Sequence, residues 1–240
     1  MSSASYEYGP AADRARKLLA LRRRRRWPLW FGVAVILIVP AIAAYVVWTK
    51  YRGAEAKAAA LAQQLGGKVT WNDGRLSGGS SRRHVMALSF AGSHFNDAQL
   101  SRFTPWWWHL PQLSDLDLSG TAITDDGLKH LSGCPIKHLS LSGTKITNYG
   151  LRHLVECPAL ASLSLSKTAI DDAGLENVCA LSNLRSLYLD GTAIGDAGLQ
   201  RLETLASLQY LRLGNNPGVT YEGIARLEAA LPELKITRGP

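Results

Sequence analysis

Cysteine is scarce in this chain of 240 residues, and the three cysteines that occur, Cys134, Cys157 and Cys179, are an odd number. Three thiols cannot build a dense disulfide framework or, by themselves, a four-thiolate zinc site. The composition, with 46% hydrophobic and 19% charged residues, is that of an ordinary globular protein. The fold must therefore be stabilised by the burial of apolar side chains.

Net charge is missing from residues 58–240, although the whole chain carries a formal net charge of +8. This part holds sixteen basic and sixteen acidic residues, whereas residues 1–57 hold eleven basic and three acidic ones. A neutral surface cannot release the counterions that drive binding to a phosphate backbone. The charge distribution therefore excludes nucleic acid as the expected partner.

Catalytic motifs are also missing. The sequence contains no G-x-S-x-G, P-loop or dinucleotide-binding fingerprint, and its Ser-Gly pairs, such as Ser119-Gly120, are typical of turns after strands. Residues 53–112 offer no convergent acid, base or nucleophile. We therefore expect no enzyme activity and no cofactor.

One long run, residues 27–48, has twenty-two positions without a charged side chain. As a helix rising about 1.5 Å per residue it covers roughly 30 Å, the thickness of the hydrocarbon core of a bilayer. Aromatic side chains, which prefer the headgroup level, lie towards its two ends: Trp27, Trp30, Tyr45, Trp48 and Tyr51. The run predicts a transmembrane helix, with a buried core helix as the alternative.

The basic residues around this run predict its orientation. Eight of them precede it, and only Lys50 and Arg52 follow it closely. Residues 1–26 are therefore expected to be a cytoplasmic tail, and everything after about residue 50 is expected on the extracytoplasmic side. A signal peptide cleaved near Ala41 to Ala43 is the competing interpretation. Because the apolar run continues beyond that site, we favour a retained signal anchor.

A repeated pattern, L-x-x-L-x-L-x-x-T-x-I-x-x-x-G-L, fills the C-terminal half of the chain. Its second leucine recurs at intervals of 23 or 24 residues, at Leu116, Leu139, Leu163, Leu187 and Leu211. A degenerate copy begins at Val85 and a stub at Leu234. The apolar residues of each copy follow period two and then helical spacing, which predicts a strand, a turn and a helix. One such unit cannot bury its apolar side alone, so the units must stack.

These residues resemble the leucine-rich repeat family, most closely its ribonuclease-inhibitor-like and cysteine-containing classes, over residues 85–240. The resemblance implies an α/β solenoid, a horseshoe with parallel strands inside and helices outside, here preceded by one transmembrane helix. Residues 49–84 are interpreted as a connector and N-terminal cap. The family usually has Asn or Cys at the turn position, where this chain has one Asn and four Thr whose hydroxyls we expect to hydrogen bond between successive loops: Asn216, Thr121, Thr144, Thr168 and Thr192.

The order of the parts is similar to that of bacterial membrane-anchored leucine-rich repeat proteins: an N-terminal anchor, a short G-G-x-V-x-W segment at residues 66–71, and T-D-x-G-L repeats. That resemblance implies protein binding as the role. Five residues stand where helix N-caps are expected, namely Thr124, Thr147, Asp171, Gly195 and Thr220. The acids that follow them, such as Asp125, are interpreted as structural partners of the helix dipole.

The spacing of His130, Cys134 and His138 invites a metal site, because these residues are four apart. Mapped onto the repeat, however, they lie on three different faces: the helical flank, the interior and the outer side of a strand. We therefore expect no metal. Cys134 and Cys157 are interpreted as core residues, and a disulfide between them stays open as an alternative.

The alternate residues of the predicted strands form two columns on the concave face of the solenoid. Tyr188, Tyr210 and Arg212 gather at the C-terminal end of these columns, and Tyr and Arg are enriched in binding hot spots. We expect a protein or peptide partner to dock here, with further polar contacts from Asp115, Asp117 and His138. The alternative is that all of these are ordinary solvated strand residues.

Three consecutive tryptophans, Trp106 to Trp108, fall in an insertion between the first two copies. Phe103, Trp107 and Leu110 share one predicted inward face, although Pro105 is expected to interrupt a helix there. We interpret the segment as a cap over the core of the first repeat. The alternative is an exposed aromatic patch.

The sequence thus predicts a non-catalytic protein-interaction or scaffold module, held at a membrane by residues 27–48. The alternative is a soluble adaptor resembling the F-box leucine-rich repeat proteins of ubiquitin ligases. The arginine block at residues 22–26 and the apolar run argue against that adaptor.

Overall fold

A computed structural model of the chain describes residues 53–72 and 84–238. The predicted tail and the apolar run at residues 27–48 lie outside the described residues. Within the described ranges, no helix is both long and apolar enough to cross a membrane. The described residues belong to one compact unit, which begins at Gly53.

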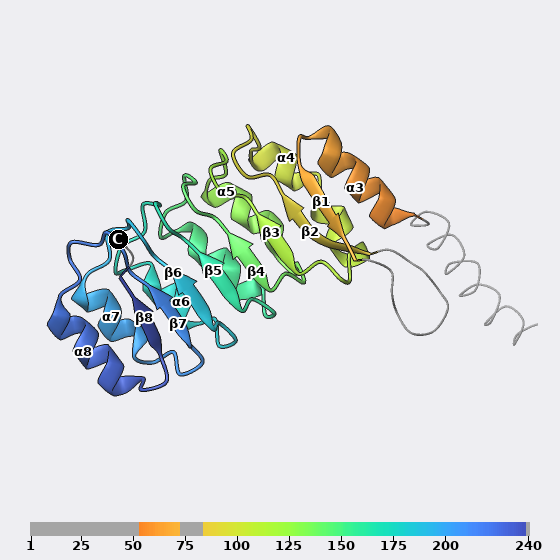
Figure 1. The fold of residues 1–240 in the computed structure, drawn as a ribbon. Helices are drawn as coiled ribbons and strands as arrows, with labels where there is room; N and C mark the ends of the chain where they lie inside the picture. Colours follow the sequence, from red (N-terminus) through yellow and green to blue (C-terminus); the bar gives the residue numbers. More distant parts are fainter. Residues whose placement is uncertain (1–52, 73–83, 239–240) are drawn as a thin grey trace, which may run out of the picture. The chain divides into compact units, whose positions relative to one another are not determined.

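Within the described residues, eight strands form one sheet in chain order (Figure 1). The helices lie along one face of this sheet and leave the other face open. Strands β2 to β8 are parallel to one another, whereas β1 runs antiparallel to β2. Their bounds are β1 Lys68–Trp71, β2 Val85–Ser89, β3 Asp115–Asp117, β4 His138–Ser140, β5 Ser162–Ser164, β6 Ser186–Tyr188, β7 Tyr210–Arg212 and β8 Lys235–Thr237. The repeat thus gives the predicted parallel sheet, and the degenerate first copy and the terminal stub both supply strands.

The outer segments of the coils are short because each coil has only about two dozen residues to close its loop. The α-helices are α3 Ala54–Gln64, α4 Asp97–Ser101, α5 Asp125–Leu128, α6 Leu175–Cys179, α7 Asp196–Leu202 and α8 Tyr221–Ala230. In the described part of the chain, three segments are 3-10 helices, namely η1 Thr104–His109, η2 Lys129–Leu131 and η3 Gly150–Glu156. Each coil therefore has a strand and a helical turn, as the pattern predicts, but several of the turns are 3-10 rather than α.

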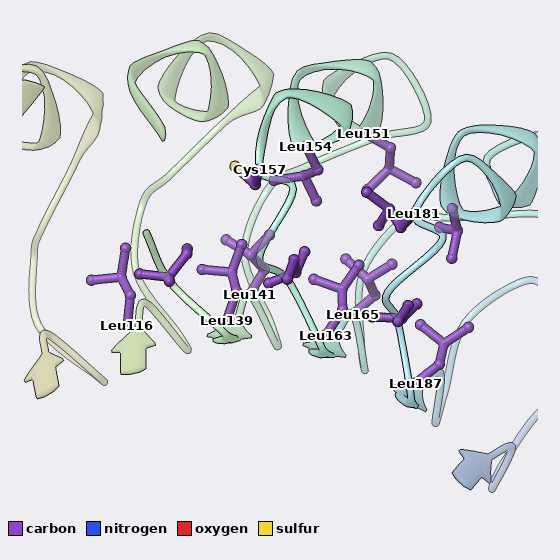
Figure 2. Close-up of a cluster of buried hydrophobic side chains, with 14 of the residues drawn as sticks. Leu116, Leu139, Leu141, Leu151, Leu154, Cys157, Leu163, Leu165, Leu181 and Leu187 are labelled. Carbon is purple, nitrogen blue, oxygen red and sulfur yellow. The ribbon is translucent and has the colours of Figure 1, made fainter. Parts of the chain in front are cut away.

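The core is a continuous stack of leucines between the sheet and the helices (Figure 2). The second leucine of every copy is buried, with an exposed fraction of at most 2%. Cys134 and Cys157 are core residues at 1% exposure and are free thiols, so the disulfide does not form. Burial raises the pKa of the Cys134 thiol to about 12 and that of Cys157 to about 11, which keeps both protonated and unreactive.

Hydrogen bonds from side chains link each coil to the next along the flank. The carboxylate of Asp125 accepts from the backbone N–H of Thr147 at 2.7 Å and from its hydroxyl at 2.6 Å. The same link recurs in the other coils, where the acceptor and the residue that donates its N–H are Asp97 and Thr124, Asn148 and Asp171, Asp172 and Gly195, and Asp196 and Thr220. We call this series the flank ladder. Of the acids predicted to serve the helix dipole, Asp125, Asp172 and Asp196 also join the coils in this way.

The flank ladder also explains the glycine in each T-D-x-G-L motif. A Cβ placed on Gly127, Gly150, Gly174, Gly198 or Gly223 would collide with the ladder Asp or Asn of the preceding coil. A side chain at this position would therefore displace the ladder Asp or Asn from its place between the coils. The ladder ends where Tyr221 occupies the position that Asp196 holds one coil earlier.

The buried threonines correct one prediction. All four Thr hydroxyls donate at 2.5–2.9 Å to a carbonyl three residues earlier in the same coil, and of the four only the Thr192 hydroxyl also has a partner in the neighbouring coil, Asn216 Oδ1 at 2.9 Å. Asn216 makes this link to the preceding coil, since its Oδ1 accepts from the N–H and the hydroxyl of Thr192 and its Nδ2 donates to the Leu189 carbonyl at 2.7 Å. A Thr hydroxyl at this turn therefore bonds across coils only where the longer amide side chain reaches it.

Three of the predicted residues, Thr124, Gly195 and Thr220, are the N-caps of α5, α7 and α8. The Thr124 hydroxyl accepts from the Asp126 N–H, and the Thr220 hydroxyl accepts from the Gly223 N–H. Gly195 precedes α7 without a side-chain cap. Thr147 and Asp171 lie in the turn before their helical segments, which begin later, at Gly150 and Leu175 in η3 and α6.

The first coil is covered by α3, β1 and an aromatic cluster. Phe103, Trp107 and Leu110 are buried as predicted, and the Trp107 indole donates to the His130 carbonyl at 2.7 Å. Trp108 instead is 77% exposed, so only part of the tryptophan run belongs to the cap. Pro105 does not interrupt the segment, because it lies in the first turn of η1, where the missing N–H costs no helical hydrogen bond.

Candidate binding surface

The sheet presents two columns of side chains on its open side, in the predicted register. The first column runs Ala87, Asp115, His138, Ser162, Ser186, Tyr210 and Lys235. The second runs Ser89, Asp117, Ser140, Ser164, Tyr188, Arg212 and Thr237. The strands lie on the inner side of the arc drawn in Figure 2, so these columns form the concave face. All six residues predicted to contact a partner lie on it.

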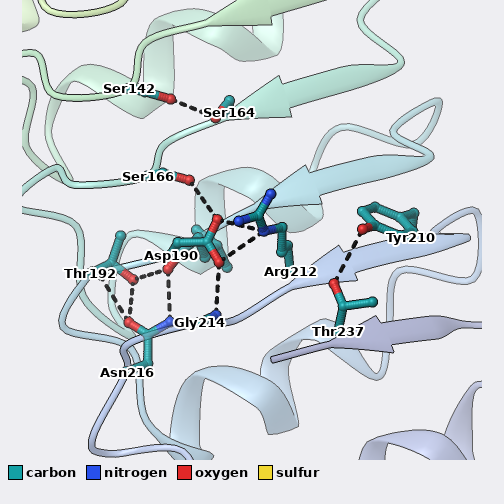
Figure 3. Close-up of polar contacts among 11 residues, drawn as sticks. Ser142, Ser164, Ser166, Asp190, Thr192, Tyr210, Arg212, Gly214, Asn216 and Thr237 are labelled. Atoms are coloured by element: carbon teal, nitrogen blue, oxygen red, sulfur yellow. Dashed lines mark hydrogen bonds and ion pairs between the residues drawn. The ribbon is translucent and has the colours of Figure 1, made fainter. Parts of the chain in front are cut away.

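The two tyrosines at the C-terminal end are in contact. The rings of Tyr188 and Tyr210 lie 5.6 Å apart between centroids, at an interplanar angle of 52°. The Tyr210 hydroxyl is 3.2 Å from Oγ1 of Thr237 on β8 (Figure 3). Because their neighbours orient them, these partly exposed rings form a fixed aromatic surface.

Arg212 is held in place by Asp190, a residue that the sequence analysis did not single out. The Arg212 Nε lies 3.0 Å from Asp190 Oδ2, and Asp190 Oδ1 also accepts from the Gly214 N–H at 2.8 Å (Figure 3). The side chain of Asp190 is only 15% exposed, whereas that of Arg212 is 44% exposed. The guanidinium group is thus oriented by a half-buried carboxylate while it remains open to solvent.

The centre of the concave face carries small hydroxyl side chains in a hydrogen-bonded series. Asp117 accepts from the hydroxyls of Ser89 and Ser119, at 3.2 and 2.6 Å. The Ser119 and Ser140 hydroxyls are 2.6 Å apart, and those of Ser142 and Ser164 are 2.7 Å apart (Figure 3). The Asp117 carboxylate is therefore held in place by neighbouring serine hydroxyls. Its position on the strand alone would suggest a carboxylate that contacts only water.

An open hollow of about 240 Å³ lies over these serines. Its lining spans β3 to β6 and consists of Asp115, Leu116, Asp117, His138, Leu139, Ser140, Ser162, Ser164 and Tyr188. Asp115 accepts from the hydroxyl of Ser114, and His138 is exposed beside it on β4. The structure thus brings Asp115, Asp117, His138 and Tyr188 around one depression, while Tyr210 and Arg212 lie beyond its rim.

The histidines and cysteines considered for a metal site do not converge. Cys134 is buried, His138 is exposed on the concave face, and the His130 ring lies 3.4 Å from the Thr104 hydroxyl on the flank. Among the described residues, no group of three or more His, Cys, Asp or Glu side chains is placed to hold a metal ion. The concave face itself therefore remains the candidate site.

A family model matches part of the described repeats. The family model described as "Leucine Rich repeat" matches residues 109–132 and 180–202. A search of curated proteins found no match.

Two solved structures from Listeria monocytogenes are among those similar to the chain. One is an internalin C2, with 21% identity and a TM-score of 0.43 over 64% of this chain and 70% of that one. The other is an internalin, inlF, with 20% identity and a TM-score of 0.44 over 61% of this chain and 45% of that one.

The family match rests on residues that the structure shows to be structural. The matched segment at residues 180–202 contains the strand β6, the buried Thr192 and the Gly198 that faces the flank ladder. Parallel strands stacked at the repeat interval, with the leucines inside, are the architecture that the family pattern encodes. The segments at residues 109–132 and 180–202 thus match the leucine-rich repeat family, and the other coils share their architecture.

Proposed function

We propose that the chain is a membrane-anchored, non-catalytic interaction module that binds a protein or peptide partner on its concave face. Solenoids of stacked repeats typically use their extended concave surfaces for binding. The observation that carries the proposal is the contact between Tyr188 and Tyr210 beside the oriented Arg212. Elsewhere the central strands of the face carry mostly serine.

The energetics support binding at this end of the face. Tyr and Arg supply large contact areas, and they dominate measured hot spots. Side chains that are already ordered lose little conformational entropy when a partner docks. Contact between the rings, the bond of Tyr210 to Thr237 and the ion pair of Arg212 with Asp190 all provide such order.

A matched pair of double variants tests this proposal. Tyr188→Ala with Tyr210→Ala removes the concave rings, whereas Tyr149→Ala with Tyr221→Ala removes two tyrosines that are 76% and 82% exposed outside the concave columns. Proteins captured by the full-length chain in detergent are identified by mass spectrometry, and each is then titrated, purified, against both variants. We expect the concave variant to bind at least about a hundredfold more weakly and the control to bind normally. Equal binding by both variants would overturn the proposal.

The membrane part of the proposal is supported by the sequence. Residues 27–48 are long and apolar enough to span, and the basic residues before them favour a cytoplasmic N-terminus. The repeats would then face the extracytoplasmic side. Protease added to sealed inside-out vesicles should leave the repeat fragment intact and digest it only after detergent is added. Digestion before detergent would favour the cytoplasmic adaptor instead.

A further inference from the structure

The hollow on the concave face has an unbalanced charge. Its lining includes the carboxylates of Asp115 and Asp117 and contains no lysine or arginine. The nearest cation on the tyrosine side, Arg212, is already paired with Asp190. Lys137 and Arg185 precede β4 and β6 and are exposed, but neither lines the hollow. The depression therefore presents net negative charge to whatever enters it.

The shape of the hollow comes from the repeat itself. Ser140, Ser162 and Ser164 supply a floor of small side chains over β4 and β5, while Tyr188 stands on the next strand. The Asp117 carboxylate is fixed by the Ser89 and Ser119 hydroxyls. A fixed acceptor at one end and an aromatic ring at the other leave room between them for one long side chain.

We infer that this hollow receives a basic side chain, a lysine or an arginine, of the protein or peptide partner, an inference that rests on the proposed function. The cationic head would bind Asp115 and Asp117 through charge-assisted hydrogen bonds. The Tyr188 ring, three strands away on β6, would pack against the methylene groups behind the charge.

The other classes of side chain fit the hollow poorly. An acidic side chain would meet two carboxylates of like charge, which costs binding energy. An apolar side chain would remove water from Asp115 and Asp117 without replacing their hydrogen bonds. Charge complementarity therefore selects a cation.

The test uses random peptides of about twelve residues displayed on phage and selected on the full-length chain in detergent. We expect the selected peptides to be enriched in Lys or Arg. In the tightest binder, changing its basic residue to norleucine should reduce affinity about tenfold or more, and Asp115→Asn or Asp117→Asn should do the same with the unchanged peptide. The losses from norleucine and from Asp115→Asn should not add, because they remove the same contact.

Two controls accompany this test. Asp126→Asn makes the same change of charge at an exposed carboxylate outside the concave columns and should leave binding unchanged. Asp115→Glu keeps the charge and should restore most of the affinity that Asp115→Asn loses. Circular dichroism of each variant shows that the fold is retained.

The outcomes separate this inference from the proposed function. If the peptides lose binding to the Tyr188→Ala, Tyr210→Ala variant but tolerate norleucine and both Asp→Asn changes, the basic-residue inference is wrong and the concave site stands. If the peptides bind that variant normally, the proposed function is wrong as well. A selection that returns no binding peptide contradicts both.

Discussion

The flank of the solenoid and its concave face obey opposite rules. On the flank, one arrangement recurs in coil after coil: an Asp or Asn accepts from the next coil, and a glycine leaves room for it. On the concave face, the same two columns change from aspartate to serine to tyrosine along the sheet. Positions that repeat hold the coils together, and positions that vary without such a structural role are free to recognise a partner.

Trp107 is an exception to this comparison, because it does not recur in the other coils and yet is buried in the core. Its replacement has the largest expected effect on stability. Trp107→Ala should lower the free energy of unfolding by about 3–5 kcal/mol, because it opens a cavity and leaves the His130 carbonyl without its donor. Trp108→Ala removes a ring that is 77% exposed and should change stability little. Equilibrium urea unfolding measures both, and equal losses would contradict the cap.

Leu163 and Ser164, neighbours on β5, compare a buried position with a position on the concave face of the same strand. Leu163→Ala should destabilise the chain by about 2–5 kcal/mol, since Leu163 has no exposed surface. Ser164→Ala removes one hydroxyl contact on the open side, to Ser142, and should cost at most about 1 kcal/mol. The two urea midpoints decide the result. Similar losses would place Ser164 in the core.

Two adjacent acids test the flank ladder. Asp125→Ala should cost about 1.5–3 kcal/mol, because the N–H and hydroxyl of Thr147 both lose a charged acceptor. Asp126→Ala, which removes only an exposed ion pair with Lys129, should have little effect. Thermal unfolding of the two variants compares them directly. If Asp126→Ala were the more damaging, the ladder would be unimportant.

The smallest expected effect is a dependence on acid pH at the last rung of the ladder. The backbone N–H and the hydroxyl of Thr220 lower the pKa of Asp196 below its ordinary value. A depressed pKa in the folded state adds stability at neutral pH that is lost as the pH falls through the folded pKa. Asp196→Asn should therefore make the loss of stability between neutral and acid pH slightly less steep. An unchanged pH profile of the urea midpoint would contradict this.

The regular part of the structure could be predicted from the sequence because the repeat fixes the register. Once Leu116 and Leu139 are known to point inward, the residues beside them must face outward, and Asp115 must lie beside His138. The columns on the concave face follow from this period alone. The buried positions of Cys134 and Cys157 follow in the same way.

Contacts between coils could not be read from the pattern, because they depend on the reach of individual side chains. The hydroxyls of Thr121, Thr144 and Thr168 bond only within their own coil, whereas the Thr192 hydroxyl also reaches Asn216 of the next coil. The ladder carboxylates likewise reach the next coil. Asp190 was missed because it looks like a turn residue in D-G-T. When the copies of the repeat are aligned, Asp190 takes the position that Ser119, Ser142 and Ser166 hold in the earlier copies. An acid in place of this serine, close to Arg212, is the signal that could have identified it.

The most direct test of the account measures two quantities on the same Tyr188→Ala, Tyr210→Ala protein: the free energy of unfolding and the affinity for an identified partner. We predict a loss of stability below about 2 kcal/mol, because the rings are partly exposed, together with a loss of affinity of at least about a hundredfold. An intact affinity, with or without a change in stability, would show that the varying positions of the concave face do not carry recognition.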